Sequence, residues 1–189
     1  MTLEEIYSEL NAHMIKGLMV HDQMASYYCF LHLKGYAKCH TCHYMEESIS
    51  YTKLKEHYLR HHRRLIKTKA IDDPKIIPNS WYAYEEKDID ATTKRNAVKT
   101  GLEKWIEWEQ GTVNLYSKMY KELFALGEID DAKYIECLLH DAEEELCDAE
   151  SMYIDKKTVD FDISSIISDQ KIKLKEYEKK IEEHCWCKK

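Results

Sequence analysis

The segment Leu102–Tyr153 reads LEKWIEWEQGTVNLYSKMYKELFALGEIDDAKYIECLLHDAEEELCDAESMY, and it decides the expected fold. Apolar residues recur at spacings of three and four on both sides of Gly127–Asp130, a pattern typical of two amphipathic helices with a short break between them. The first stripe consists of Leu102, Ile106, Val113, Tyr116, Tyr120 and Leu123, and the second of Ile135, Leu138, Ala142, Ala149 and Met152. We therefore expect a helical hairpin.

Carboxylates interrupt both apolar stripes. Glu109 lies three residues after Ile106 and four before Val113, within the first stripe. Glu145 interrupts the second stripe, and Asp141 lies one turn before it, so both can face the same way. A carboxylate directed at a core is costly unless it is paired, protonated or bound to a metal ion. Two neighbouring helices that both carry such groups point to a shared polar site.

The composition favours a single all-α domain. The 189 residues include only two prolines and five glycines, and almost no stretch alternates apolar with polar residues over the length of a strand. A chain of this size can bury one sizeable core. We expect one domain over residues 1–189, with a helical bundle over about 3–153 and an extra C-terminal helix over about 164–185.

The N-terminal third predicts one long helix and a polar connector. Thr2 and Glu5 have the spacing of a capping box, and the apolar face that follows continues to about Leu33. Asp22 falls on that face. Gly35 is expected to end the helix, and Lys38–His43 to form the connector.

A second helix is expected from Tyr44 to about Thr68, with His57 and His61 one turn apart on the same face. The segment Asp72–Asp90 contains Asp-Asp-Pro and Ile-Pro-Asn-Ser, which predicts a long crossover connection. After the central hairpin, Asp155–Asp162 is expected to be a polar break before the last helix.

The charge and the cysteines limit the class of protein. The formal net charge of −7 makes nucleic acid an unlikely partner, and the basic residues of Lys53–Lys55 and Arg60–Arg64 fit a solvated helix face. No apolar signal core follows Met1, and no apolar run approaches the ~20 residues of a membrane span. Seven cysteines without a regular framework suit reduced thiols. We expect a cytoplasmic protein without membrane contact.

The order of four long helices, with a short, a long and a short link and then a fifth helix, resembles the ferritin family. Asp22-Gln23-Met24-Ala25-Ser26-Tyr27 is similar to the Glu-Leu-Tyr-Ala-Ser-Tyr type of run in the first helix of ferritins, with Asp in place of Glu. Glu109-Gln110 resembles a Glu-Gln pair in the third helix of bacterial ferritins, and the acidic positions of the fourth helix fall on Asp141 and Glu145.

This resemblance implies an antiparallel four-helix bundle with a long crossover, a homo-oligomer, and an iron site inside the bundle. The implied ligands are Asp22, His57 or His61, Glu109, Asp141 and Glu145. The implied chemistry is oxidation or storage of iron. The chain departs from the family in its second helix, because Tyr44–Thr68 contains no Glu-x-x-His spacing. A bundle that has lost its metal centre and serves a structural or interaction role is therefore the alternative.

Cysteine motifs suggest two further sites. Cys39-x-x-Cys42-His43 matches the attachment signature of c-type haem, which requires export to an oxidising compartment. The same two cysteines, together with Cys185 and Cys187, would supply four thiolates for structural zinc if the last helix returned to the first connector. Free surface thiols are the simpler interpretation.

Overall fold

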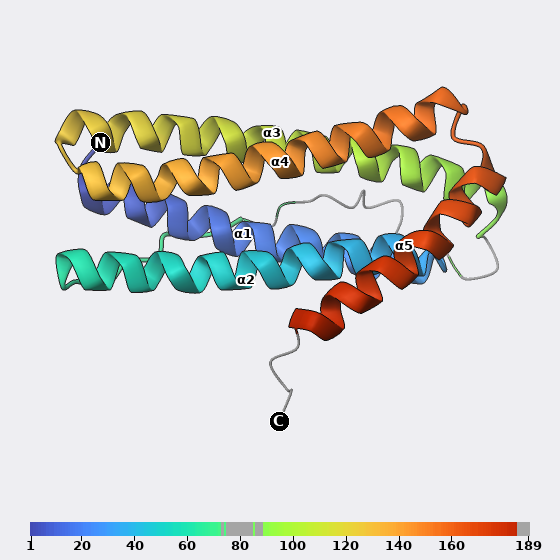
Figure 1. Cartoon of the computed structure of the whole chain (residues 1–189), viewed down its shortest axis with the longest axis horizontal. Helices are drawn as coiled ribbons and strands as arrows, with labels where there is room; N and C mark the ends of the chain where they lie inside the picture. Colours follow the sequence, from blue (N-terminus) through green and yellow to red (C-terminus); the bar gives the residue numbers. More distant parts are fainter. Residues whose placement is uncertain (73, 75–84, 86–88, 185–189) are drawn as a thin grey trace.

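A computed structural model describes residues 1–72, 74, 85 and 89–184. Four long helices lie side by side, and a fifth crosses one end of the bundle (Figure 1). The elements are α1 (Leu3–Phe30), α2 (Lys34–His62), α3 (Ala91–Leu126), α4 (Ile129–Thr158) and α5 (Ile163–His184). The predicted all-α bundle with a C-terminal fifth helix is confirmed.

The bundle consists of two helical hairpins. Leu31–Leu33 joins α1 to α2, and Gly127 with Glu128 joins α3 to α4. Gly127 has φ of +80°, a left-handed conformation that glycine adopts without the penalty of a Cβ. The predicted break is therefore confirmed at Gly127 and Glu128, whereas Ile129 and Asp130 already belong to α4. The N-terminal capping box is also confirmed, since the Thr2 side chain accepts from the Glu5 amide and Glu5 accepts from the Thr2 amide.

The predicted start of the second helix is wrong. α2 begins at Lys34, so Lys38–His43 belongs to a helix and not to a connector. Gly35 does not end a helix: a Cβ there would lie 2.0 Å from the Gln170 carbonyl oxygen. The glycine allows α5 to cross close to the start of α2. The helix ends at His62, earlier than expected, where Arg63 takes a left-handed conformation with φ of 55°.

The predicted break at Asp155–Asp162 begins too early, because α4 continues to Thr158. Lys156 is buried within this extension, and its ammonium lies 3.1 Å from Asp169 of α5. That pairing draws the last turn of α4 toward α5. Most of the predicted crossover at 72–90 lies outside the described residues.

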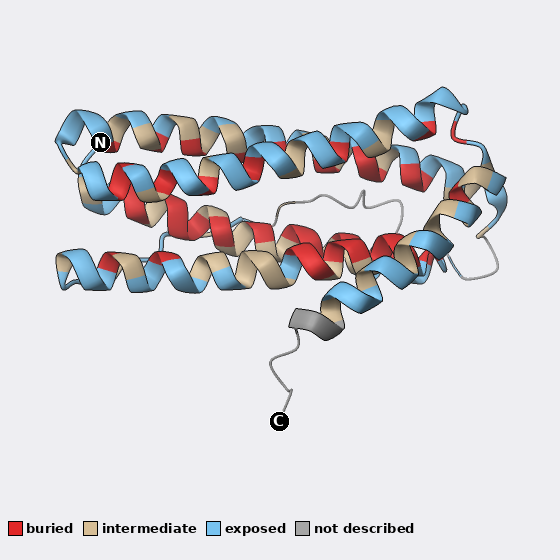
Figure 2. Ribbon diagram, viewed as in Figure 1, coloured by how far each residue is buried: buried red, intermediate tan, exposed pale blue. Residues whose placement is uncertain are grey.

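A polar layer separates two hydrophobic clusters in the bundle. One cluster, near α5, includes Met24, Tyr28 and Trp105, and the other includes Leu10, Leu54 and Met119. Buried residues follow the inner face of each helix (Figure 2). Between the clusters lie the buried polar residues His21, His40, His43, Glu109 and Thr112. This layer positions the candidate site at mid-bundle.

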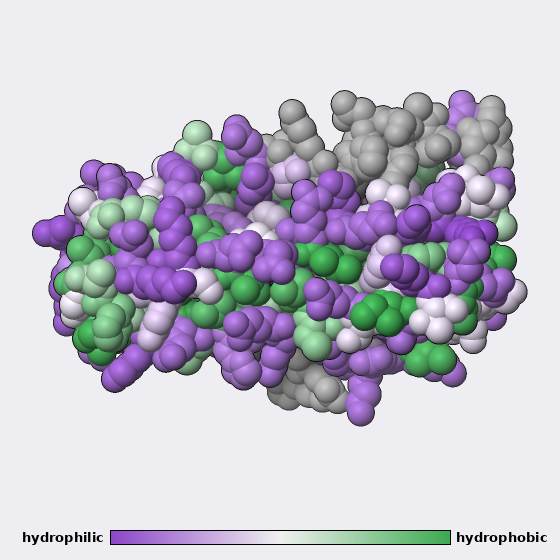
Figure 3. Space-filling model, turned by 90° about the horizontal axis from the view of Figure 1, so that it is seen from above, coloured by the Kyte–Doolittle hydropathy of each residue, from purple (hydrophilic) through white to green (hydrophobic). Residues whose placement is uncertain are grey.

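Charged and polar side chains cover most of the face shown in Figure 3, with apolar side chains scattered between them. Within the described residues, no helix is both long enough and apolar enough to cross a membrane.

His13 of α1 should make stability depend on pH. Its ring stacks on Trp108 at 4.6 Å, and Nε2 lies 2.9 Å from the Thr112 hydroxyl. Burial, followed by the charge of Lys16, lowers the pKa of His13 from 6.5 to about 4. Between these values the unfolded chain binds a proton that the folded chain does not. We expect up to about 3 kcal/mol of stability to be lost as pH falls through this window.

Urea unfolding at about pH 7 and about pH 4.5 measures this contribution. The His13→Gln variant keeps a polar group near Thr112 but cannot take up the proton, so its stability should fall less on acidification. An equal fall in the variant and the wild type would contradict the assignment to His13.

Candidate metal centre

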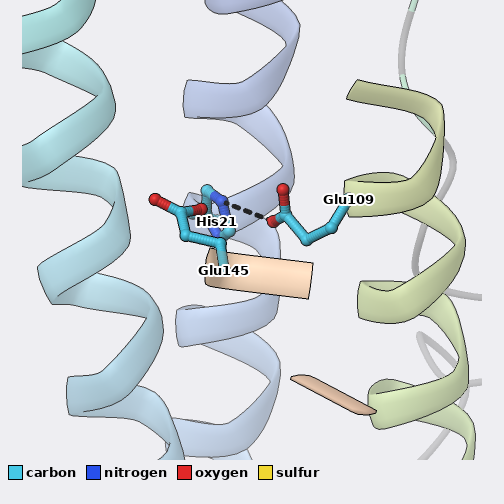
Figure 4. A group of neighbouring side chains, drawn as sticks. All are labelled: His21, Glu109 and Glu145. Atoms are coloured by element: carbon cyan, nitrogen blue, oxygen red, sulfur yellow. Dashed lines mark ion pairs between the residues drawn. The ribbon is translucent and has the colours of Figure 1, made fainter. Parts of the chain in front are cut away.

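All four bundle helices contribute to the polar layer. His21 comes from α1, Glu109 from α3 and Glu145 from α4, and their side chains point toward one another (Figure 4). His21 is 0% exposed and Glu109 is 1% exposed, and His21 Nε2 lies 3.7 Å from Glu109 Oε1. One ligand atom from each of the three residues lies within 4.8 Å of the others. The spacing is compatible with one shared cation.

The second helix supplies His43, Glu46 and Glu47. The His43 Nδ1 atom lies 3.6 Å from Glu145 and 3.6 Å from Glu46, so these residues form a second overlapping group of ligand atoms. Glu47 reaches across to α1, where its Oε1 lies 3.0 Å from the place that a Cβ on Gly17 would occupy. The absence of a side chain at Gly17 thus makes room for this carboxylate.

Two carboxyl groups of the layer, those of Glu109 and Glu47, hold protons unusually tightly. Burial, followed by the negative charge of Glu145, raises the pKa of Glu109 well above its usual range. The same two causes raise the pKa of Glu47 to about 8. A cation among these three groups would relieve both the desolvation and the mutual repulsion.

The histidines of the layer differ in charge. Burial, followed by the nearby ring of His43, lowers the pKa of both His21 and His40 well below 6.5, so both rings are neutral. Their Nδ1 atoms are 3.2 Å apart. Burial alone would lower the pKa of His43, but the nearby Cys39 and Glu145 side chains outweigh it and raise that pKa well above 6.5.

Two buried imidazole nitrogen atoms of the layer lack a hydrogen-bond partner among the described residues. In the described part of the chain, His21 Nε2 and His43 Nδ1 make no hydrogen bond although both are inaccessible to solvent. Buried polar atoms without partners cost free energy, and they are uncommon in native proteins. Both atoms face carboxylates, and imidazole nitrogen with carboxylate oxygen is a donor set that suits divalent iron and similar metals. The residues present therefore fit a metal ion.

A cleft of about 430 Å³ leads to this layer from the surface. Glu47, Glu109 and Glu145 line it, and so do Glu144 and Asp148 of α4. Acidic walls raise the local concentration of cations and speed their entry. The cleft thus provides a route by which a cation reaches the buried groups.

The six sequence-predicted ligands are not all brought together. Glu109 and Glu145 meet in the layer, and Asp141 is exposed in the lining of the cleft. Asp22 is exposed, since the neighbouring His21 occupies the interior position. The remaining two, His57 and His61, lie about four and five turns beyond His43 on α2, where His57 contacts Asp131 of α4.

Sequence reasoning missed His21, His40, His43, Glu46 and Glu47. Once α2 begins at Lys34, His40, His43 and Glu47 have spacings of three and four and share one helical face. The histidine precedes the glutamate here, in the reverse order of the Glu-x-x-His spacing that the resemblance suggested. With a helix start at Tyr44, His40 and His43 fall in the expected connector and not on the helix that carries Glu47.

The cysteines do not form a site in the described residues. Cys39 and Cys42 are buried, and the Cys42 thiol contacts the Tyr177 carbonyl of α5 at 3.8 Å. Burial raises the pKa of Cys42 to about 11, which favours the thiol over the thiolate that zinc requires. Cys185 and Cys187 lie outside the described residues, and the structure gives no support for zinc at these cysteines.

Adding a methyl group at Gly17 should weaken metal binding without unfolding the protein. Alanine in a helix interior is more favourable than glycine by about 0.5–1 kcal/mol, but its Cβ would displace the Glu47 carboxylate. We expect Gly17→Ala to weaken Fe²⁺ binding about 10-fold or more, measured by anaerobic titration.

Gly111→Ala is the matched control, because a Cβ at Gly111 meets nothing within 4 Å. It should leave Fe²⁺ binding unchanged. Equal Fe²⁺ affinity in the Gly17→Ala and Gly111→Ala variants would show that Glu47 does not contribute.

Comparison with known proteins shows the fold. No protein-family model and no curated protein matches the sequence. Among solved structures, an Archaeoglobus fulgidus ferritin engineered into a closed form matches with a TM-score of 0.72 and 13% identity, covering 92% of this chain and 96% of that one. An open-pore ferritin from the same hyperthermophilic archaeon has a TM-score of 0.72 and 14% identity, with coverages of 90% and 93%. A humanized archaeal ferritin has a TM-score of 0.71 and 14% identity, with coverages of 90% and 94%.

Proposed function

We propose that this chain, a ferritin-like bundle, binds ferrous iron as a substrate in the mid-bundle polar layer and oxidises it with dioxygen. The observation that carries the proposal is the convergence of His21, Glu109 and Glu145 from three helices, with a buried imidazole nitrogen that has no hydrogen-bond partner among the described residues. The likeness to ferritins shows the fold, and the donor set of this chain supports the choice of iron.

The carboxylates would bind iron and balance its charge. Glu47, Glu109 and Glu145 lie close together: after burial, the negative charge of Glu145 is the next cause that raises the pKa of Glu47 and of Glu109. A cation that replaces their protons is therefore stabilised by all three carboxylates. Their negative charge also favours the higher charge of Fe³⁺ over Fe²⁺, which promotes loss of an electron. Charge balance and oxidation thus depend on the same groups.

The histidines would orient the ion. His21 is neutral at physiological pH, so its ring can offer a lone pair, and His40 holds the opposite edge of the ring at Nδ1. Such support fixes the direction of the ligand. Each ferrous ion loses one electron to dioxygen, and solvent supplies the protons that the reduced oxygen takes up. Trp105 donates to Glu109 at 2.9 Å and holds that carboxylate in position.

Stopped-flow absorbance of Fe²⁺ mixed with aerobic protein tests the proposal. We expect ferric product to form well above the rate in buffer, and we expect Glu145→Gln to lower the initial rate about 10-fold or more. Glu143→Gln is the control, because Glu143 is an exposed carboxylate on the same helix. A wild-type rate equal to that of buffer would favour the alternative of a bundle without a metal centre.

The expectation of a homo-oligomer remains a prediction. Phe124, Leu126 and Ile129 are 59%, 47% and 42% exposed around the α3–α4 turn, and exposed apolar side chains of this kind are often buried between copies of a chain. Light scattering of the purified protein measures the mass and tests the expectation.

A further inference from the structure

A second cluster of histidine and carboxylate side chains lies at the end of the bundle far from α5. There the last turns of α2 meet the first turn of α4 (Figure 1). His57 Nε2 lies 2.9 Å from one carboxylate oxygen of Asp131, and His62 Nε2 lies 2.9 Å from the other. The Asp131 side chain is only 3% exposed, and those of His57 and His62 are 14% and 17% exposed.

We propose that His62, Asp131 and Glu128 bind a divalent transition-metal ion. One ligand atom from each of the three residues lies within 4.8 Å of the others. His57 contacts the other Asp131 oxygen and holds the carboxylate in position. Bonds of about 2.0–2.1 Å place neighbouring ligand atoms about 2.9–3.4 Å apart around a metal ion. The distance of 2.9 Å between His62 Nε2 and Asp131 Oδ2 agrees with that spacing.

The position of Glu128 gives independent support to the proposed site. Glu128 is the N-cap residue of α4, yet its side chain makes no capping hydrogen bond. Glutamate is not a preferred residue at this position of a helix, where Ser, Thr, Asp and Asn serve better. Its carboxylate instead lies near His62 and Asp131. One imidazole and two carboxylates form a donor set suited to zinc, cobalt or ferrous ions.

Surrounding aromatic residues hold the proposed ligands in place. The Tyr7 hydroxyl donates to the same oxygen of Asp131 that contacts His57. Tyr134 stacks on the His57 ring at 4.3 Å with an angle of 10°, and Tyr58 packs against His62 at 5.0 Å. Contacts that fix the orientation of ligands are typical of metal sites, where they add to affinity.

The proposed end site is separate from the mid-bundle layer. Each cluster contains a contact between a histidine of α2 and a carboxylate of α4, His43 with Glu145 and His57 with Asp131. The two contacts are fourteen residues apart on both helices, which run antiparallel. At 1.5 Å per residue the separation is roughly 21 Å. The proposal of an end site therefore does not depend on the proposed oxidation of iron, and either proposal can be wrong while the other holds.

Titration with Co²⁺, followed by visible absorption, tests the end site in the full chain. In the Glu109→Leu variant the mid-bundle layer has lost a proposed ligand. We expect this variant still to bind one Co²⁺, with the intense visible absorption bands that Co²⁺ shows when its coordination number is low. His62→Gln keeps a hydrogen-bond donor for Asp131 but loses the imidazole, so its Kd for Co²⁺ should rise about 100-fold.

Asp130→Asn is the matched control, because Asp130 is an exposed carboxylate beside Asp131, and it should leave Co²⁺ binding unchanged. Circular dichroism of His62→Gln checks that the helices remain formed. Absence of Co²⁺ bands in Glu109→Leu, or equal Co²⁺ affinity in folded His62→Gln and wild type, would overturn the proposal and leave a hydrogen-bonded network of histidine and aspartate.

Discussion

Replacing Glu109 by leucine is expected to slow the oxidation of Fe²⁺ at least about 100-fold. The substitution removes a 1%-exposed carboxylate that faces His21 Nε2 at 3.7 Å, at the centre of the proposed iron site. Loss of a group that only supports a metal ligand costs about 10- to 100-fold in affinity or activity, and loss of a ligand should cost more. Initial rates of ferric formation, measured at several Fe²⁺ concentrations, give the size of the effect.

The fold should survive this substitution. Leucine leaves the Trp105 indole N–H without its acceptor at a cost of about 1–3 kcal/mol, but it also removes a desolvated carboxyl group that Glu145 repels. These effects oppose each other, so we expect the free energy of unfolding of the metal-free protein to change by less than about 2 kcal/mol.

Glu107→Gln is the matched control for Glu109→Leu. Glu107 lies on the same helix, is 70% exposed and pairs with Lys104 on the surface. Its substitution should leave the oxidation rate unchanged. A folded Glu109→Leu protein that oxidises Fe²⁺ as fast as Glu107→Gln would exclude the mid-bundle layer as the iron site.

Replacing Asp169 by alanine is expected to lower the free energy of unfolding by about 3 kcal/mol. Asp169 of α5 lies 3.1 Å from the Lys156 ammonium and accepts from the Tyr36 hydroxyl at 2.9 Å, so it links α4, α2 and α5. The Lys156 side chain is 9% exposed. Removal of one partner from a buried ion pair leaves an uncompensated charge, which typically costs about 3–5 kcal/mol. Because Asp169 is 23% exposed, we expect the lower end.

Two further variants separate this ion pair from general damage to α5. Adding Lys156→Met to Asp169→Ala removes the unpaired charge and should restore much of the lost stability. Glu176→Ala breaks only an exposed pair with Lys180 on α5 and should cost less than about 0.5 kcal/mol. Urea unfolding measures all three, and a loss in Asp169→Ala no larger than in Glu176→Ala would contradict the role of Asp169.

The α3–α4 hairpin could be predicted from the sequence because its periodicity and its turn chemistry agree. Apolar residues keep helical spacing on both sides of the break, and Gly127 takes the left-handed conformation that ends α3. Glu109 and Glu145 stood out as carboxylates within apolar stripes. For these two residues, the cost of burying a charge was enough to locate them in the interior.

The first helix shows how a small error in register changes a predicted site. Residues His21, Met24 and Tyr28 continue the buried face of α1, whereas Asp22 lies one residue further, a rotation of about 100° that exposes it. The resemblance in Asp22–Tyr27 drew attention to the acidic residue. Its neighbour was the one that the helical period places inside.

The second helix could not be predicted from local signals alone. Gly35 looks like a helix end, and the cysteines and histidines of Lys38–His43 have no apolar pattern. The reason for that glycine is the approach of α5, whose residues are separated from it by more than a hundred positions in the sequence. Tertiary packing therefore decided where α2 begins, and with it which histidine reaches the site.

Anomalous X-ray diffraction at the iron absorption edge, from crystals soaked anaerobically in Fe²⁺, tests the central claim most directly. We expect an anomalous peak enclosed by His21, Glu109 and Glu145, and its absence from Glu109→Leu crystals treated in the same way. A wild-type map with no peak in the mid-bundle layer, or with iron only at exposed carboxylates, would contradict it.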